Sequence, residues 1–231
     1  MPPSSTAAPE RCSNVSSSTL TRLRGQILNG QIPPGEKLHL EQLKATYNVS
    51  LSPLREALSR LVSEGLVIQV DQRGFQVAPV SKENLDEVTV LRQTMEVMAL
   101  REAISKGDDA WEAEVVSALH RLSNLSPRGE ANEINEEWEH WHRQLHMALL
   151  RGCRAPVMLQ FCDTLLDLSD RYRRIFFRPT PAPRDVHSEH RAIAEAALAR
   201  DADKACDLMR KHIAVTCSLI ESALPPDLQA A

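Results

Sequence analysis

The sequence predicts a mainly α-helical protein made of two parts that differ in construction. Its 231 residues include only 8 glycines and 4% aromatic residues, while 42% are hydrophobic. The core must therefore consist mainly of aliphatic side chains, in a composition that favours helix. Apolar residues also recur at helical spacing along most of the chain. A short β-branched stretch within residues 66–80 is the exception, and it divides the chain into its two parts.

Three helical patterns come first. Residues 18–29 and 40–47 each place leucines on one stripe, and Asn48 stands where a left-handed C-cap residue is expected. The third helix is expected to start at Ser52, which can cap it, with Pro53 in the first helical position. Leucines at spacings of three and four indicate that one face of this helix is buried.

A hairpin follows the three helices. Residues 66–70 and 75–80 are β-branched or alternating, and the DQRG between them is a turn. Three helices and a hairpin, with a tight turn at Asn48 between two of the helices, predict a winged helix-turn-helix over residues 18–80.

The N-terminal segment gives little sign of structure. Residues 1–17 are rich in Ser, Thr and Pro, so we expect a disordered tail. They lack the apolar core of a signal peptide, and no apolar run nears the roughly 20 residues that cross a bilayer. Five cysteines, an odd number without a CxxC pair, indicate reduced thiols. We therefore expect a cytoplasmic protein with no membrane partner.

The second part, residues 81–225, is predicted to be entirely helical, with a frayed tail at 226–231. Ser81 precedes an acidic first turn and should cap the first helix. Turn sequences such as SPRG and RPTPAP separate the helices. Six helices are expected, at residues 81–106, 109–124, 131–151, 155–178, 185–200 and 202–223.

The third helix of the first part offers a surface that could read DNA. Opposite its leucines it carries serine hydroxyls, which hold phosphates, and an arginine that can bind guanine N7 and O6 bidentately. At the hairpin tip, an arginine can reach phosphates or a narrow minor groove. The candidate DNA-binding residues are Ser50, Ser52, Arg55, Arg60, Arg73 and Gly74. Residues 15–80 carry seven basic and five acidic residues, which permits a nucleic-acid partner without demanding one.

The stretch EHWHRQLH holds three of the eight histidines of the chain. His142 and His146 are four residues apart and share one helix face, whereas His140 points away. His190 and His212 lie on the apolar stripes of two later helices and are expected to face inward. Four imidazoles that meet from three helices would suit zinc or a similar divalent ion.

The first part resembles the N-terminal domain of the GntR family of bacterial transcription regulators. The resemblance rests on ILNGQIPPGEKL, on PLREALSRLVSEGLV and on RGFQVAPV. It implies a homodimer on a pseudo-palindromic double-stranded operator, with contacts near Ser50, Ser52, Arg55 and the wing tip. Many members of the family carry Arg where this chain has Leu51, so an operator sequence does not carry over.

Residues 85–222 resemble the FCD ligand-binding domain of the FadR branch of the family, through LRQTMEVMALREA, LHMALLRGCRAPVML and EHRAIAEAALARDADKACDLMRKHI. That branch often binds a metal through an Asp four residues before a His and two later His. Matched residue by residue, these positions are His142, His146, His190 and His212, with His142 where Asp or Asn is usual. The resemblance implies a divalent metal, zinc first, with nickel or manganese as alternatives.

Two arginines are candidates for binding a small carboxylic acid beside the metal. Arg92 falls at the usual inward-facing arginine of the family. Arg171 lies beside Leu168 and Tyr172 on the inner face of its helix, where it could bind a carboxylate bidentately. The RYRR stretch and the two histidines four residues apart look most like regulators that sense short dicarboxylates such as glutarate.

Three functions remain open at this point. The first is a DNA-binding regulator, expected to be a repressor, controlled by a carboxylate that binds next to a metal. The second is a regulator that responds to the metal alone. The third is a metal-dependent hydrolase, but HExxH and GxSxG motifs are absent, so we do not expect an enzyme.

Overall fold

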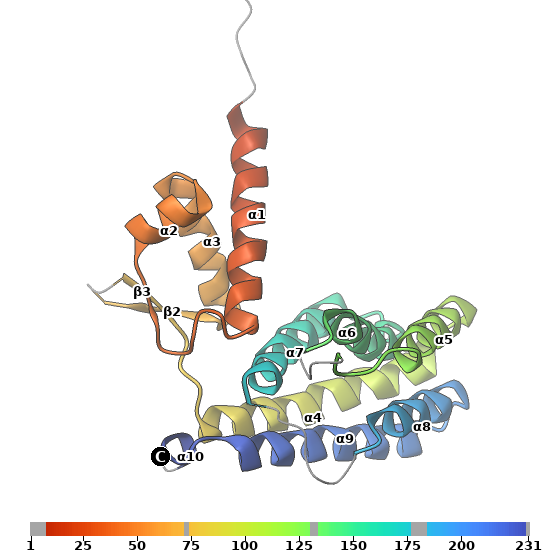
Figure 1. The fold of residues 1–231 in the computed structure, drawn as a ribbon. Coiled ribbons are helices and arrows are strands. Elements are labelled where there is room, and N and C mark those ends of the chain that lie inside the picture. The colour runs from red at the N-terminus through yellow and green to blue at the C-terminus, as the bar shows by residue number, and fades with distance from the viewer. Residues whose placement is uncertain (1–7, 72–73, 130–133, 177–183, 230–231) are drawn as a thin grey trace, which may run out of the picture. The chain divides into compact units, whose positions relative to one another are not determined.

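The computed structural model describes residues 8–71, 74–129, 134–176 and 184–229. The chain divides into two compact units, an N-terminal unit, residues 1–80, and a helical unit, residues 81–231. Both units are visible in Figure 1. None of the helices in the described ranges combines the length and the apolar character of a membrane span.

The N-terminal unit is a winged helix-turn-helix, as predicted. Its described residues form three helices and a small antiparallel sheet in the order β1-β3-β2. Its elements are α1 (Ala8–Leu28), β1 (Lys37–Leu38), α2 (Leu40–Tyr47), α3 (Leu51–Ser63), β2 (Val67–Val70) and β3 (Gly74–Val77). Asn48 is the C-cap of α2 with a left-handed φ of 51°, which confirms the tight turn between α2 and α3.

Three details of this unit differ from expectation. Helix α1 begins at Ala8, inside the expected tail 1–17, and Pro9 falls in its first turn, where a missing N–H costs little. Strand β1 was not predicted, because two residues carry no periodic signal. The N-cap position of α3 is Ser50 instead of Ser52, without a side-chain cap hydrogen bond. Pro53 therefore takes the third helical position, still within the turn whose N–H groups need no helical partner.

Helix α3 is held by its leucines. Leu54, Leu58 and Leu61 are fully buried, as are Leu23 and Ile27 on α1, and the two helices pack against each other. Burying a leucine stabilises the folded state by about 1.5–3 kcal/mol. Because this face of α3 is buried, the opposite face of the helix is exposed to solvent.

Within its described residues, the helical unit contains the six predicted helices and one more, although the helix predicted at 131–151 begins at Glu136. They are α4 (Lys82–Lys106), α5 (Asp109–Ser123), α6 (Glu136–Arg151), α7 (Pro156–Phe176), α8 (Val186–Leu198), α9 (Ala202–Ala223) and the short α10 (Pro226–Gln229). The last lies in the segment 226–231 that was expected to fray. The Ser81 side chain accepts a hydrogen bond from Asn84 N at 3.2 Å, which confirms the predicted cap of α4. Helices α4 and α9 run side by side (Figure 1) and pack along their length.

Tyr172 ties α7 to the beginning of α4. Its side chain is 1% exposed. The hydroxyl accepts a hydrogen bond from Ser81 N at 3.1 Å and lies 3.0 Å from both the Ser81 carbonyl and the Asn84 side-chain oxygen. The first turn of α4 is therefore anchored to the C-terminal part of α7.

Candidate metal centre and anion pocket

The structure brings the four predicted histidines to one place. His142 and His146 come from α6, His190 from α8 and His212 from α9. All four are buried, at 6%, 1%, 1% and 5% exposure. One ligand nitrogen from each lies within 4.8 Å of the others. His140, by contrast, is exposed, in line with its exclusion from the candidate set.

Several nitrogens of this cluster lack a partner among the described residues. They are His142 Nδ1, His146 Nε2 and both ring nitrogens of His190. An unpaired polar atom in a buried position costs free energy. A divalent ion that prefers nitrogen ligands would satisfy these atoms at once, so the donor set fits the metal that the sequence suggested.

Three of the four imidazoles, those of His142, His190 and His212, have pKa values below the ordinary value. Burial, together with the neighbouring positive charges, holds the pKa of His142 and of His190 well below the ordinary 6.5. Burial also lowers the pKa of His212 to about 4, although Glu189 opposes this shift. Neutral rings keep a free lone pair at neutral pH, so protons do not compete with a metal there.

Two carboxylates that the sequence analysis missed contact the cluster. His146 Nδ1 lies 3.2 Å from Glu96 Oε2 on α4, and His212 Nδ1 lies 2.7 Å from Glu189 Oε2 on α8. Burial alone would raise the pKa of Glu96, but Arg92 and His146 outweigh it and lower that pKa to about 2. Arg184 and His212 similarly lower the pKa of Glu189 to about 2 against its burial. Both carboxylates are therefore ionised at neutral pH and only accept hydrogen bonds.

Each of these carboxylates is held by an arginine. Arg92 binds Glu96 through two nitrogens and also donates to Ser169 at 2.8 Å. Arg184 binds Glu189 through two nitrogens, at 2.8 and 2.6 Å. The spacing of Arg92 and Glu96, four residues on one helix, is a sequence signal that could have found Glu96.

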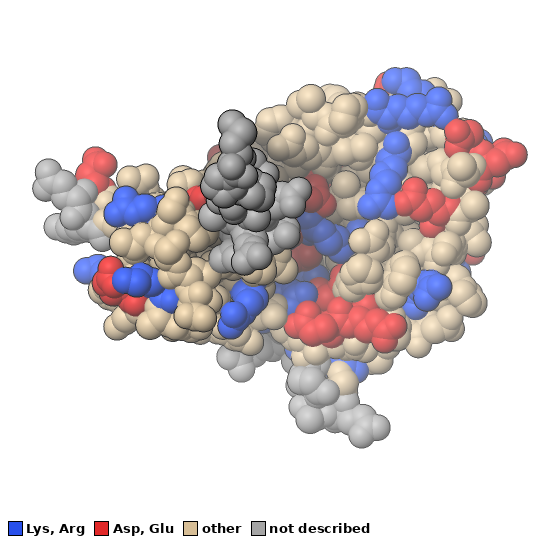
Figure 2. Space-filling view, turned by 90° about the horizontal axis from the view of Figure 1, so that it is seen from above, with Lys and Arg blue, Asp and Glu red and all other residues tan. Residues whose placement is uncertain are grey.

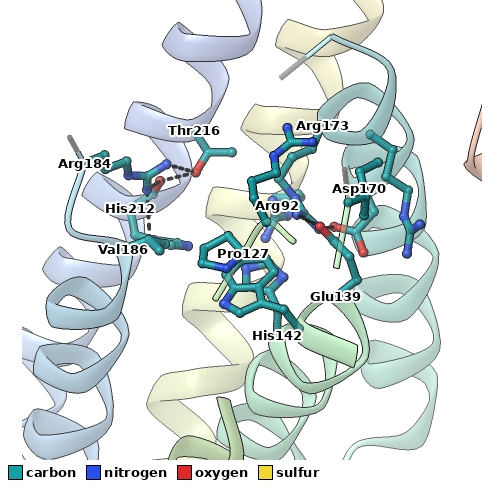
Figure 3. Close-up of a pocket in the computed structure, with 14 residues that line it drawn as sticks. Arg92, Pro127, Glu139, His142, Asp170, Arg173, Arg184, Val186, His212 and Thr216 are labelled. Carbon is teal, nitrogen blue, oxygen red and sulfur yellow. Dashed lines mark hydrogen bonds and ion pairs between the residues drawn. The ribbon is translucent and has the colours of Figure 1, made fainter. Parts of the chain in front are cut away.

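A cavity of about 120 Å³ opens beside His142 and His212 (Figure 3). Its wall combines arginines with acidic, apolar and imidazole groups. The lining residues are Arg92, Pro127, Arg128, Ile134, Trp138, Glu139, His142, Asp170, Arg173, Arg174, Arg184, Val186, His212 and Thr216. We call this cavity the anion pocket, because arginine is its most frequent residue.

The two effector candidates are placed differently. Arg92 lines the anion pocket, but Arg171 does not, although it is buried. Arg173 follows Asp170 by three residues and shares its face, whereas Arg171 lies two positions from Arg173 and points about 160° away from it. The anion pocket receives Arg173 from α7 and Arg184 from the segment before α8, neither of which the sequence analysis proposed.

Arg173 lines the anion pocket and lies close to the histidine cluster. It donates to Glu139 and, at 2.8 Å, to Asp170 Oδ1. Its guanidinium also lies 5.5 Å from the centre of the Trp138 ring, and Trp138 stacks on His142 at 4.7 Å with an angle of 15°. Figure 3 shows Arg173, Glu139 and Asp170 on one side of His142, with Arg184, His212 and Thr216 on the other.

We expect the metal-free protein to lose stability as the pH falls from about 6.5 to about 4. His212 titrates near 6.5 when unfolded and near 4 when folded, so in this window the unfolded state binds the extra proton and the free energy of unfolding falls. At about 1.4 kcal/mol per pKa unit, His212 alone accounts for roughly 3 kcal/mol. His142 and His190 act in the same direction. Urea unfolding at a series of pH values measures this, and an unchanged stability from pH 7 to 4.5 would contradict buried neutral imidazoles.

The candidate DNA-binding residues lie on the exposed face of α3 and at the wing. Ser50, Ser52, Arg55 and Arg60 are exposed. Arg60 forms an ion pair with Glu56 at 2.9 Å. Gly74 has a left-handed φ of 88°, and Arg73 lies outside the described residues.

The charges on the surface are mixed in sign. On the face that Figure 2 draws, Lys and Arg side chains are interspersed with Asp and Glu side chains. This pattern favours recognition by a few well-placed contacts over a general attraction to polyanions.

Comparison with known proteins gives a family match for each of the two units. Residues 16–77 match the bacterial regulatory proteins of the gntR family, and residues 87–215 match the FCD domain. The chain is 37% identical to the HTH-type transcriptional repressor GlaR of Escherichia coli K12, over 87% of this chain and 94% of that protein. It is 38% identical to the HTH-type transcriptional regulator BphR of Paraburkholderia xenovorans LB400, over 93% and 89%.

Solved structures share the fold. The chain superimposes on Escherichia coli McbR/YncC with a TM-score of 0.74 at 21% identity, covering 90% of this chain and 97% of that one. A GntR regulator from Rhodococcus sp. RHA1 gives a TM-score of 0.73 at 18% identity, covering 91% and 99%.

The winged helix-turn-helix and the helical unit together define a DNA-binding transcription regulator. The chain belongs to the GntR family, in the FadR subfamily that carries an FCD domain. Its relatives are regulators and not enzymes, so the alternative of a metal-dependent hydrolase is wrong.

Proposed function

We propose that the protein is a cytoplasmic, homodimeric repressor whose operator affinity is set by a small carboxylic acid bound next to a divalent metal. The observation that carries this proposal is the anion pocket, which opens directly beside two of the clustered histidines. The repressor role is taken from the similarity to GlaR, which is named a repressor. In a homodimer, two winged helices would bind half-sites roughly 34–36 Å apart.

His142, His146, His190 and His212 would hold the metal. Zinc suits four imidazole nitrogens best, and nickel or manganese are the alternatives. A metal with an open coordination position supplies a Lewis acid for one carboxylate oxygen of the effector. The chain itself contributes four imidazole ligands, all of them buried.

The arginines of the anion pocket would bind the rest of the effector. Arg173 and Arg184 lie on the two sides of His142 in Figure 3, and Arg92 also lines the wall. A cavity of about 120 Å³ has room for a molecule several times larger than water. A short dicarboxylate can place one carboxylate at the metal and present the other to an arginine, which binds it bidentately.

A thermal-shift screen of zinc-loaded protein with short dicarboxylates, followed by operator binding, tests the proposal. We expect at least one dicarboxylate to raise the melting temperature by mass action and to change operator affinity. The monocarboxylate of equal length is the matched control for the second carboxylate. A screen in which no acid stabilises the metal-loaded protein would contradict carboxylate control.

A regulator that responds to the metal alone is the second candidate. It is favoured by the pairing of Arg92, Arg173 and Arg184 with carboxylates of the protein itself, which leaves the anion pocket balanced without a ligand. In that case chelation of the metal would change operator affinity, and added acids would have no further effect.

A further inference from the structure

We propose that Glu96 and Glu189 are positioning residues that select Nε2 of His146 and of His212 as the metal-binding atoms. This inference rests on the proposed metal site and goes beyond its four ligands. It assigns a role to two side chains that do not line the anion pocket.

Hydrogen bonding fixes which ring nitrogen is free. A carboxylate only accepts hydrogen bonds, so a ring nitrogen in contact with it must carry the proton. His146 Nδ1 meets Glu96 at 3.2 Å and His212 Nδ1 meets Glu189 at 2.7 Å. Protonation of Nδ1 leaves the lone pair on Nε2, and His146 Nε2 is buried without a partner among the described residues.

His212 Nδ1 also lies 3.2 Å from a nitrogen of Arg184. The carboxylate is closer, and a lone pair on Nδ1 would face its negative charge. The contact with Glu189 therefore decides the tautomer of His212.

These contacts form two series, each of which runs from an arginine through a glutamate to a histidine. The first runs from Arg92 through Glu96 to His146, and its glutamate side chain is 0% exposed. The second runs from Arg184 through Glu189 to His212. In each, the arginine holds the carboxylate with two hydrogen bonds, so that the carboxylate keeps its orientation toward the ring.

The two series of contacts differ in how well the role of their glutamate can be tested by substitution. Removing the charge of Glu96 would leave Arg92 buried without its partner, which destabilises the fold. Glu189 is 31% exposed, so Glu189→Gln is expected to fold. Glu112→Gln is the matched control, since Glu112 also pairs with an arginine, at 38% exposure, and lies on α5 away from the histidine cluster.

The experiment measures Zn²⁺ affinity by competition with a chelator, on the full-length wild type and on both variants. We expect Glu189→Gln to weaken Zn²⁺ binding by about 10- to 100-fold, the usual cost of losing an outer partner of a metal-binding histidine. Glu112→Gln is expected to bind Zn²⁺ like the wild type.

A spectroscopic measurement separates positioning from general destabilisation. In the metal-free wild type, ¹⁵N NMR of labelled histidines should show His212 protonated at Nδ1, and Glu189→Gln should remove this preference. His212→Asn identifies the signal.

The outcomes are distinct. If the wild type binds Zn²⁺ and Glu189→Gln binds it equally well, the positioning role is overturned while the metal site stands. If His212 in the wild type is protonated at Nε2, the positioning role is likewise overturned. If the wild type binds no Zn²⁺, the proposed metal function itself fails, and the positioning role fails with it.

Discussion

Replacing His190 by alanine is expected to abolish stable metal binding by the helical unit. His190 is 1% exposed, and both of its ring nitrogens are without a partner among the described residues. Its ring centre lies 4.6 Å from that of His212 and 5.0 Å from that of His142, so it stands among the other ligands. Removing a ligand should cost more than the roughly 10- to 100-fold that losing an outer partner costs.

Metal content after dialysis and the melting temperature with and without Zn²⁺ measure this effect. For the wild type, free Zn²⁺ at about 100 times its dissociation constant should add roughly 2.7 kcal/mol of stability, and His190→Ala should show no such gain. His140→Ala is the control, because His140 is exposed on α6 and outside the cluster. If His190→Ala retained its full metal content, the metal would have to bind at a site that does not include His190.

Replacing Arg55 by alanine is expected to weaken operator binding by about 1–3 kcal/mol, or roughly 5- to 150-fold. Arg55 is exposed on α3, and the described part of the chain provides it with no ion pair. Its guanidinium is therefore available for the two acceptors of guanine. Arg60 is held by Glu56 at 2.9 Å, so Arg60→Ala should cost less.

The operator can be obtained by selecting random DNA with the wild-type protein, and affinities should be compared at one fixed salt concentration. Arg101→Ala, which removes one exposed charge from the helical unit, controls for net charge. If Arg55→Ala binds the selected DNA as tightly as the wild type, α3 does not read bases through this residue.

Much of the fold could be predicted from the local periodicity of apolar residues. The winged helix-turn-helix followed from turn residues and leucine spacing, and the φ of Asn48 agrees with its assignment. The meeting of His142, His146, His190 and His212 could be anticipated because four-residue spacing and apolar stripes determine which way a helical side chain faces.

Contacts between helices could not be predicted from the sequence. Glu189 and Arg184 meet His212 only because α8 packs on α9, and no spacing along one helix encodes that packing. Arg173 and Arg171 differ by two positions, and distinguishing them requires knowing the direction in which α7 faces its neighbours. Strand β1 depends on pairing with β3, a partner about 40 residues later.

The anchoring of Tyr172 limits how the helical unit can move. A buried ring whose hydroxyl is fixed to the backbone of Ser81 cannot turn to another rotamer without breaking those bonds. A rotation or shift of α7 at Arg173 and Asp170 would therefore either break these hydrogen bonds or move the first turn of α4. Ser81, the N-cap of α4, is thus coupled by hydrogen bonds to the helix that supplies Arg173 and Asp170 to the anion pocket.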